Sequence, residues 1–298
     1  MAEKTSSSSR RSQSSKTAAG SANSAEGAPA DRTEVVARLL ALLLRNQKLR
    51  KFTLPVVALA GAFFYLTASA GGNQTIESFS QAKKLLETQV YADHRVTLYC
   101  GAPFDAKKNI TLPAGFTTPS HEKRAARVEW EHVVPAENFG RFFTEWREGD
   151  KACIEESGKA YKGRRCADRA SRDYRLMQAD LYNLYPAVGA VNALRSNYNY
   201  AMLPGASSTF GSCEMKISQG RAEPPERARG TIARSTLYMA DAYSRYRISD
   251  QQRQLMEAWN RMYPADEWEC TRAERIARIQ GNPNRFVEEA CRRAGLRK

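Results

Sequence analysis

The sequence predicts an α+β fold in which helices outnumber strands, and three observations favour this class. Apolar residues recur at helical spacing in 75–92 and through the last third of the chain. Alternation of apolar and polar residues is confined to two short segments, 96–100 and 128–132. Residues 73–298 show no internal repeat and no long linker, which indicates a single domain.

Residues 75–132 are expected to form one helix and two strands. The apolar positions of 75–92 fall on one helical face, and 96–100 alternate as a strand does. The polar segment 106–124 contains two prolines and predicts a loop. Residues 128–132 alternate again and predict a second strand, which Pro135 ends.

The middle of the chain predicts short helices and loops. Residues 139–146 predict a helix, and 148–170 predict a basic loop with a cysteine towards either end. The segment 180–185 is expected to be short and partly extended. Pro186 predicts the first turn of a further helix, because proline is favoured at that position. Residues 204–226 are polar, contain three prolines and predict a loop.

The last third predicts successive helices with recognisable ends. Ser249 and Gln252 have the spacing of a capping box, which marks a helix start. Gly281 marks a helix end. The helices predicted here are 232–243, 249–263, 272–279 and 284–293.

The N-terminal part differs in composition from the rest. Residues 1–51 are serine-rich with scattered basic residues, and we interpret them as a disordered leader. Residues 52–70 follow a basic flank, are largely apolar and end in A-x-A, as secretory signals do. We favour export with cleavage after Ala70, which leaves 71–298 as the exported domain. Two alternatives stay open: a start codon assigned too early, or an uncleaved membrane anchor with a cytoplasmic tail.

The net charge is +14, and the excess is not confined to the N-terminal part. Residues 1–72 hold ten Lys/Arg and four Asp/Glu, so the remainder holds 36 and 28, a net of +8. A basic domain is suited to a polyanion such as nucleic acid, because phosphate binding releases counterions. Solubility alone, or an anionic surface, would explain the charge equally well.

All six cysteines lie in the predicted exported domain. An even number there predicts three disulfides, and the lack of a C-x-x-C pair argues against a zinc ribbon or a redox motif. Local separation favours Cys153–Cys166 and Cys270–Cys291, which leaves Cys100–Cys213.

The segment Val128–Pro135 places a glutamate beside one of three histidines, and two asparagines follow, Asn183 and Asn192. Mg²⁺ prefers oxygen ligands and needs only one or two from the protein, which Glu131 and Asn192 would supply. His132 suits a general base because its ordinary pKa lies near neutrality. Adjacent strand residues point to opposite faces, so both can line one site only where the strand twists or ends. Asn183 is expected to hold the loop shape.

Three motifs carry a family resemblance. They are Glu129–Glu137, Met177–Leu184, and Gly189–Asn192 followed by Arg195-Ser196-Asn197. Arg229-Gly230, Ile232-Ala233-Arg234 and Trp268–Arg272 extend the match over roughly 76–292. The chain resembles the bacterial endonuclease I family of periplasmic and secreted nucleases.

The resemblance implies a ββα-metal (His-Me finger) motif within a mostly helical mixed fold. It implies metal-dependent, largely sequence-nonspecific cleavage of DNA, and often RNA, that leaves 5′-phosphate ends. The base falls on His132, and the ligands of Mg²⁺, for which Mn²⁺ or Ca²⁺ can substitute in the site, fall on Glu131 and Asn192. A phosphate-contacting arginine precedes a cysteine in the family, and we prefer Arg164 to Arg165 for it. Some members have a glutamate where this chain has Gln178.

Further arginines are candidates for contacts with nucleic acid, although a basic cluster is equally typical of a solvated surface. The set is Arg165, Arg195, Arg229 and Arg234. We expect a periplasmic or secreted monomer whose partners are DNA or RNA and a divalent cation, with membrane contact only through an uncleaved N-terminal segment. The rival hypotheses are a catalytically inactive nucleic-acid-binding protein, and a membrane-anchored structural protein whose basic tail contacts anionic lipid.

Overall fold

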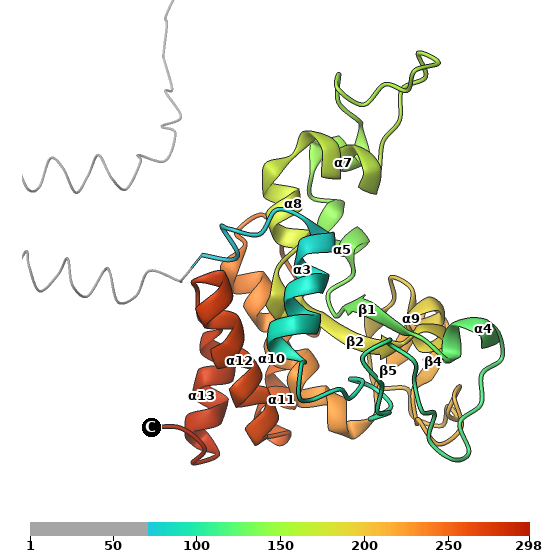
Figure 1. Cartoon of the computed structure of the whole chain (residues 1–298), viewed down its shortest axis with the longest axis vertical. Coiled ribbons are helices and arrows are strands. Elements are labelled where there is room, and N and C mark those ends of the chain that lie inside the picture. The colour runs from blue at the N-terminus through green and yellow to red at the C-terminus, as the bar shows by residue number, and fades with distance from the viewer. Residues whose placement is uncertain (1–70) are drawn as a thin grey trace, which may run out of the picture. The chain divides into compact units, whose positions relative to one another are not determined.

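The computed structural model describes residues 71–298, so the predictions for 1–51 and 52–70 lie outside the described residues. The α+β class is confirmed: many helices surround small sheets (Figure 1). The helices are α3 (Phe79–Leu85), α4 (Glu122–Ala125), α5 (Ala136–Gly140), α6 (Thr144–Arg147), α7 (Arg164–Ala170), α8 (Arg172–Gln178), α9 (Gly189–Arg195), α10 (Glu226–Ala242), α11 (Asp250–Met262), α12 (Glu267–Gln280) and α13 (Arg285–Arg293). A π-helical turn η1 (Leu86–Val90) continues α3, and a 3₁₀ turn η2 (Leu181–Asn183) follows α8.

The strands form two small sheets. In the first, β1 (Val128–His132) pairs antiparallel with β2 (Leu184–Val188). In the second, β5 (Arg221–Glu223) lies between β3 (Asn199–Tyr200) and β4 (Lys216–Ser218). The prediction of a loop over 204–226 was therefore wrong in part. Its prolines flank the two strands rather than interrupt them, so their missing N–H groups remove no ladder hydrogen bond.

The helix predicted to start at Pro186 was also wrong. Pro186 lies in β2, opposite Trp130, and the helix α9 begins at Gly189. The Pro186 carbonyl accepts a hydrogen bond from the Leu98 N–H at 2.8 Å, so the backbone polar groups of Pro186 point away from β1. A proline costs no ladder hydrogen bond at such a position.

The strand predicted over 96–100 does not form. Val96 makes only an isolated bridge to Pro103, and residues 98–100 belong to a turn. Gly101, with φ +62°, lets the chain reverse at once, so the segment makes only one hydrogen bond to β2, from Leu98 to Pro186, and no ladder with it.

The helix predicted over 139–146 is divided into α5 and α6. A Cβ atom at Gly140 would lie 2.3 Å from the Trp146 ring, so the indole packs directly on this glycine. A continuous helix would separate residues 140 and 146 by about 9 Å along its axis. The predicted loop 148–170 ends in α7, and the segment between α6 and α7 projects from the rest (Figure 1).

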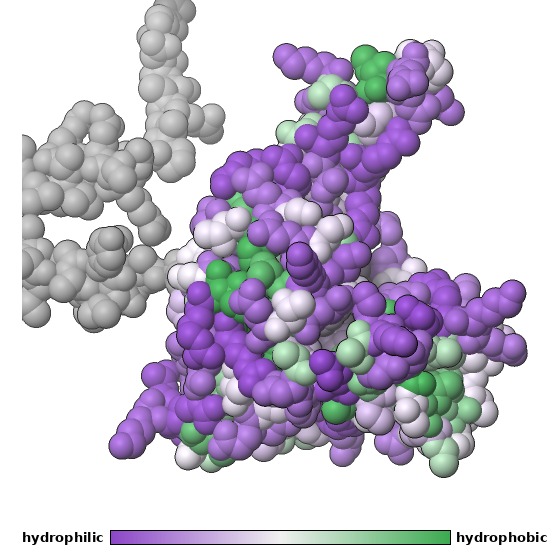
Figure 2. Space-filling view, viewed as in Figure 1, coloured by the Kyte–Doolittle hydropathy of each residue, from purple (hydrophilic) through white to green (hydrophobic). Residues whose placement is uncertain are grey.

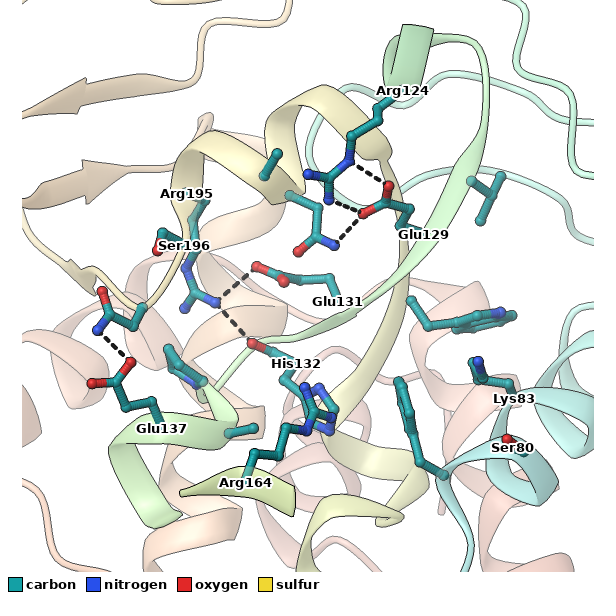
Figure 3. A pocket seen from close by; sticks show the side chains of 18 of the residues that line it. Ser80, Lys83, Arg124, Glu129, Glu131, His132, Glu137, Arg164, Arg195 and Ser196 are labelled. Carbon is teal, nitrogen blue, oxygen red and sulfur yellow. Dashed lines mark hydrogen bonds and ion pairs between the residues drawn. The ribbon is translucent and has the colours of Figure 1, made fainter. Parts of the chain in front are cut away.

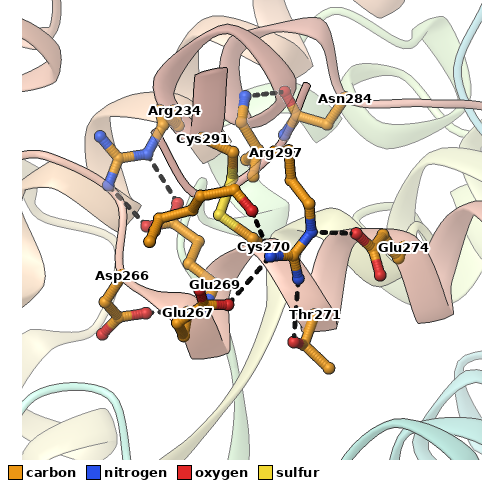
Figure 4. Close-up of a disulfide and its surroundings, with 12 residues drawn as sticks. Arg234, Asp266, Glu267, Glu269, Cys270, Thr271, Glu274, Asn284, Cys291 and Arg297 are labelled. Carbon is orange, nitrogen blue, oxygen red and sulfur yellow. Dashed lines mark hydrogen bonds and ion pairs between the residues drawn. A yellow bond between two sulfur atoms is a disulfide. The ribbon is translucent and has the colours of Figure 1, made fainter. Parts of the chain in front are cut away.

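The C-terminal helices follow their sequence signals closely. The Ser249 side chain accepts a hydrogen bond from the Gln252 N–H at the start of α11, and Gly281 caps α12 in the left-handed conformation. The helix α12 begins five residues earlier than 272, because Asp266 caps it there. The helices α12 and α13 lie side by side, joined by Cys270–Cys291 (Figure 4).

The structure contains all three disulfides that the sequence favours: Cys100–Cys213, Cys153–Cys166 and Cys270–Cys291. The face seen in Figure 2 is mostly hydrophilic, with only small apolar patches. Within 71–298, no helix is both long and apolar enough to cross a bilayer.

Candidate active site

A cleft of about 890 Å³ opens beside the end of β1. Its walls come from α3, η1, α4, β1, α5, α6, the first residue of α7, and α9 (Figure 3). The residues Glu131, His132, Arg164 and Asn192, which are distant in sequence, all line it. Its charged residues are Lys83, Lys84, Glu87, Lys108, Arg124, Glu129, Glu131, Glu137, Arg164 and Arg195.

The carboxylate of Glu131 is buried and held from one side. Its Oε1 accepts hydrogen bonds from the Tyr99 hydroxyl and from Arg195 Nη1, both at 2.8 Å. The Tyr200 hydroxyl lies 2.6 Å from that of Tyr99 and extends the network. Burial raises the pKa of Glu131, and the Arg195 guanidinium opposes this. The other oxygen, Oε2, receives no hydrogen bond from the described residues and is left for a ligand in the cleft.

The His132 ring is held on the opposite side of the strand end. Its Nε2 lies 2.8 Å from the backbone carbonyl oxygen of Gln178, and its ring centroid lies 4.9 Å from that of Phe79. A carbonyl only accepts, so Nε2 carries the proton and Nδ1 carries the lone pair of the neutral ring. Burial, with a contribution from the Arg164 charge, lowers the pKa of His132 to about 3. The ring is therefore neutral at pH 7.

Glu131 and His132 are adjacent on β1, so a regular strand would direct their side chains to opposite faces. They can line one cleft because the strand ends at His132. Glu131 points towards Arg195, and His132 points towards Arg164 (Figure 3). Because His132 is the last residue of β1, the chain turns away there and both side chains still line one cleft.

Asn192 reaches the cleft from α9. Its Nδ2 donates to Glu129 Oε2 at 2.8 Å, and Glu129 in turn receives two hydrogen bonds from Arg124, at 2.7 and 2.6 Å. Glu129 and Glu131 share one face of β1, as residues two apart on a strand do.

Arg164, the first residue of α7, lines the cleft, whereas its neighbour does not. The Arg164 guanidinium lies 5.4 Å from the centroid of the Phe79 ring, which packs against His132. Arg165 instead pairs with Glu155 at 2.7 Å and stacks on Tyr161. This geometry favours Arg164 over Arg165 as the arginine beside the base.

Three other arginines predicted to contact nucleic acid have structural partners instead. The Arg195 side chain is 1% exposed, pairs with Glu131, and also donates to the carbonyls of His132 and Val133. The Arg234 side chain, also 1% exposed, donates from Nε and Nη2 to the two carboxylate oxygens of Glu269. Arg229 is buried and bridges Glu223, Tyr263 and the Pro224 carbonyl. Basic residues near a motif suggested phosphate contacts, whereas these three guanidinium groups are buried and already paired within the protein, which argues against that role.

Asn183 is fully buried and ties two segments together. Its Oδ1 accepts from the Val134 N–H at 2.7 Å, and its Nδ2 donates to the Val134 carbonyl at 3.0 Å. The amide thus fixes the chain just after His132, in keeping with a loop-holding role.

The sequence left unassigned several groups that line the cleft or hydrogen-bond to the residues lining it. Glu129 could have been found, because it lies two residues before Glu131 on a predicted strand. Tyr99, Tyr200 and the Gln178 carbonyl have no local signal, since each reaches the site from a separate segment.

The described residues contain no group of three or more His, Cys, Asp or Glu side chains close enough together to hold a metal ion. The candidate ligands in the cleft are of another kind, one carboxylate and one amide. Both are hard oxygen donors of the type that Mg²⁺ and Ca²⁺ accept.

Comparison with known proteins gives one consistent result. The family model for Endonuclease I matches residues 77–291. A periplasmic deoxyribonuclease of Aeromonas hydrophila is 39% identical over 225 residues, which cover 73% of this chain and 88% of that protein. An extracellular deoxyribonuclease of the same species is 37% identical, covering 76% and 94%. Endonuclease-1 of Buchnera aphidicola subsp. Acyrthosiphon pisum is 36% identical, covering 73% and 83%.

The match spans the whole cleft, from α3 to α9, and continues through the C-terminal helices. The relatives are named as periplasmic or extracellular enzymes, and three disulfides fit an oxidising compartment, so this is an exported protein. The chain belongs to the endonuclease I family.

Proposed function

We propose that this protein is an exported, metal-dependent endonuclease that hydrolyses DNA, and RNA as a second substrate, without strong sequence preference. The observation that carries the proposal is the meeting of Glu131, His132, Asn192 and Arg164 in one basic-walled cleft. The names of the relatives, deoxyribonuclease and endonuclease, support the substrate class.

We propose that β1, β2 and α9 make up a ββα-metal motif. The two strands are antiparallel, α9 follows β2 without a loop, and α9 packs on both strands. In this arrangement the base and one ligand come from β1, and the second ligand comes from the helix.

The donor set in the cleft fits a single Mg²⁺ ion. Glu131 Oε2 and Asn192 Oδ1 receive no hydrogen bonds from the described residues, so both oxygens are free to act as ligands. Arg195 offsets the charge of Glu131, which leaves more of the ion's positive charge for a phosphate. When bound, the ion would neutralise charge on the phosphoryl oxygens and stabilise the departing 3′ oxygen.

His132 serves as the general base. The Gln178 carbonyl orients the ring and keeps the proton on Nε2, so Nδ1 accepts a proton from the attacking water. A phosphate bound near Arg164 offsets that arginine's charge, which raises the pKa of His132 in the complex above that of the free protein. Attack opposite the 3′ oxygen leaves the phosphate on the 5′ end.

Arg164 contacts the phosphate as well, from the side of His132 that faces away from the metal ligands. It lies at the N-terminus of α7, and it has no ion-pair partner among the described residues, so its guanidinium is free to bind an anion. Contacts to the backbone phosphates alone carry no sequence information, which is consistent with nonspecific cleavage.

The test is plasmid digestion by the purified exported protein with Mg²⁺ and with EDTA. We expect EDTA to stop cleavage and His132→Ala to lower the rate by roughly 10²–10⁴-fold, the usual contribution of a positioned base. Wild-type rates in the variant would refute the assignment. Salt-sensitive DNA binding with no cleavage under any metal would favour the inactive nucleic-acid-binding protein instead.

A further inference from the structure

The carboxylate of Glu129 bridges Asn192 on α9 and Arg124 on α4. Figure 3 shows the Arg124 guanidinium facing Glu129. Asn192 donates to Oε2, and Arg124 donates to both Oε1 and Oε2. Glu129 shares a face of β1 with Glu131, but both of its carboxylate oxygens already accept hydrogen bonds from neighbouring side chains. Its position makes it a support for Asn192 rather than another ligand.

The bridge determines which end of the Asn192 amide faces the cleft. A carboxylate can only accept, so the atom of Asn192 that contacts it must be the nitrogen. The oxygen Oδ1 therefore points away from Glu129. An amide turned by half a rotation would direct its nitrogen towards a cation and its oxygen towards a carboxylate, and both contacts would be repulsive.

Close packing at the start of α9 makes this contact possible. A Cβ atom at Gly189 would lie 2.9 Å from Glu129 Oε1 and 2.5 Å from the backbone oxygen of Arg124. Any larger residue there would push α9 away from β1 and α4. The glycine thus lets Asn192, one turn further along α9, reach the carboxylate of Glu129.

We propose that Glu129 is a positioning residue that orients the Asn192 amide so that Oδ1 faces the divalent cation. This inference rests on the proposed function, because it takes Asn192 as a metal ligand. Arg124 keeps Glu129 in place through two hydrogen bonds. A continuous chain of hydrogen bonds therefore joins Arg124 on α4, Glu129 on β1 and Asn192 on α9. Loss of such an outer partner lowers metal affinity by roughly 10–100-fold in other metal sites.

The test measures metal affinity apart from catalysis. Binding of Mn²⁺ to the purified exported protein, without DNA, is followed by electron paramagnetic resonance. We expect Glu129→Ala to raise the Kd for Mn²⁺ by roughly 10-fold or more, and saturating Mn²⁺ to restore most of kcat. Glu122→Ala removes an exposed carboxylate from the same helix as Arg124, and we expect it to keep the wild-type Kd.

Glu129→Gln keeps an acceptor oxygen for Asn192 but loses the ion pair, so its Kd should fall between those of wild type and Glu129→Ala. This variant decides the matter if Glu129→Ala fails to fold. A wild-type Kd in both Glu129 variants, or a loss of kcat that saturating Mn²⁺ does not restore, overturns the inference.

Two further variants separate this inference from the proposed function. If Glu131→Gln and Asn192→Ala weaken Mn²⁺ binding and the Glu129 variants do not, only the role of Glu129 is refuted. If Glu131→Gln and Asn192→Ala bind Mn²⁺ as tightly as wild type, the metal site itself is refuted, and the role of Glu129 with it.

Discussion

Arg195 Nη1 lies 2.8 Å from Glu131 Oε1, and both side chains are almost wholly removed from solvent. The same guanidinium donates to the backbone carbonyls of His132 and Val133. Arg195 therefore holds the candidate metal ligand and the backbone of the candidate base at once, from the last turn of α9.

Replacing Arg195 should destabilise the fold as well as the site. In Arg195→Ala the buried Glu131 carboxylate loses its counter-charge and two carbonyls lose their donors. Breaking a buried pair in this way costs about 3–5 kcal/mol, whereas loss of an exposed pair costs less than about 1 kcal/mol. Urea unfolding of the oxidised protein measures the difference, with Arg141→Ala, which breaks the exposed pair with Glu137, as control. Equal stability of the two variants would contradict the role given to Arg195.

Two adjacent arginines offer a matched pair for testing the phosphate contact. Arg164 lines the cleft, and Arg165 pairs with Glu155 outside it. We expect Arg164→Ala to lower kcat by roughly 10²–10³-fold, since removal of a positioned donor from a transition state has effects of this order. Arg165→Ala should remain within a few-fold of wild type. Steady-state cleavage of a defined duplex gives both values, and a larger effect at Arg165 would reverse the assignment.

The disulfides should differ in what they contribute to stability. Cys100–Cys213 closes a loop with a sequence separation of 113 residues, and Cys153–Cys166 one of 13. Chain-entropy arguments give the longer loop the larger stabilisation, by roughly 2 kcal/mol. Denaturant unfolding of the two double Cys→Ala variants should show this order.

Non-reducing mass spectrometry of the native protein should find no free thiol, and an alkylatable cysteine would count against the three pairs.

Acid should weaken the fold partly through His94. Its ring stacks on Trp268 with centroids 3.9 Å apart, and burial lowers the pKa of His94 below the ordinary value of 6.5. The fold thus favours the neutral ring: the stabilisation is complete above pH 6.5 and is lost as the pH falls towards the lower folded-state pKa.

Thermal unfolding at pH 7.5 and 5.5 checks this expectation. His94→Gln, which cannot titrate, should lose less stability between the two pH values than wild type does. His132, whose pKa is also lowered, contributes with the same sign, so the variant reduces the pH dependence without abolishing it. His121→Gln, at an exposed site, should behave as wild type. An unchanged pH dependence in His94→Gln would refute the prediction.

Local signals predicted the parts of the fold that depend on neighbouring residues. Apolar periodicity located the helix that begins at Phe79, and Ser249 and Gly281 marked helix ends that the structure confirms. The failures came where a distant segment decides the outcome. Pro186 lies in a strand because β1 lies on one side of it and Leu98 on the other.

The sequence by itself determined the family, the central motif and the residue types that its chemistry needs. Glu131, His132 and Asn192 could be named as candidates because each lies within a short contiguous motif of the sequence. The tertiary structure alone decided the partners of these residues: Tyr99 and Arg195 for Glu131, and the Gln178 carbonyl for His132. It also showed that Arg229 and Arg234 belong to the interior. The reason is physical: an arginine's role depends on its burial and its counter-charge, and both are set by segments far away in the chain.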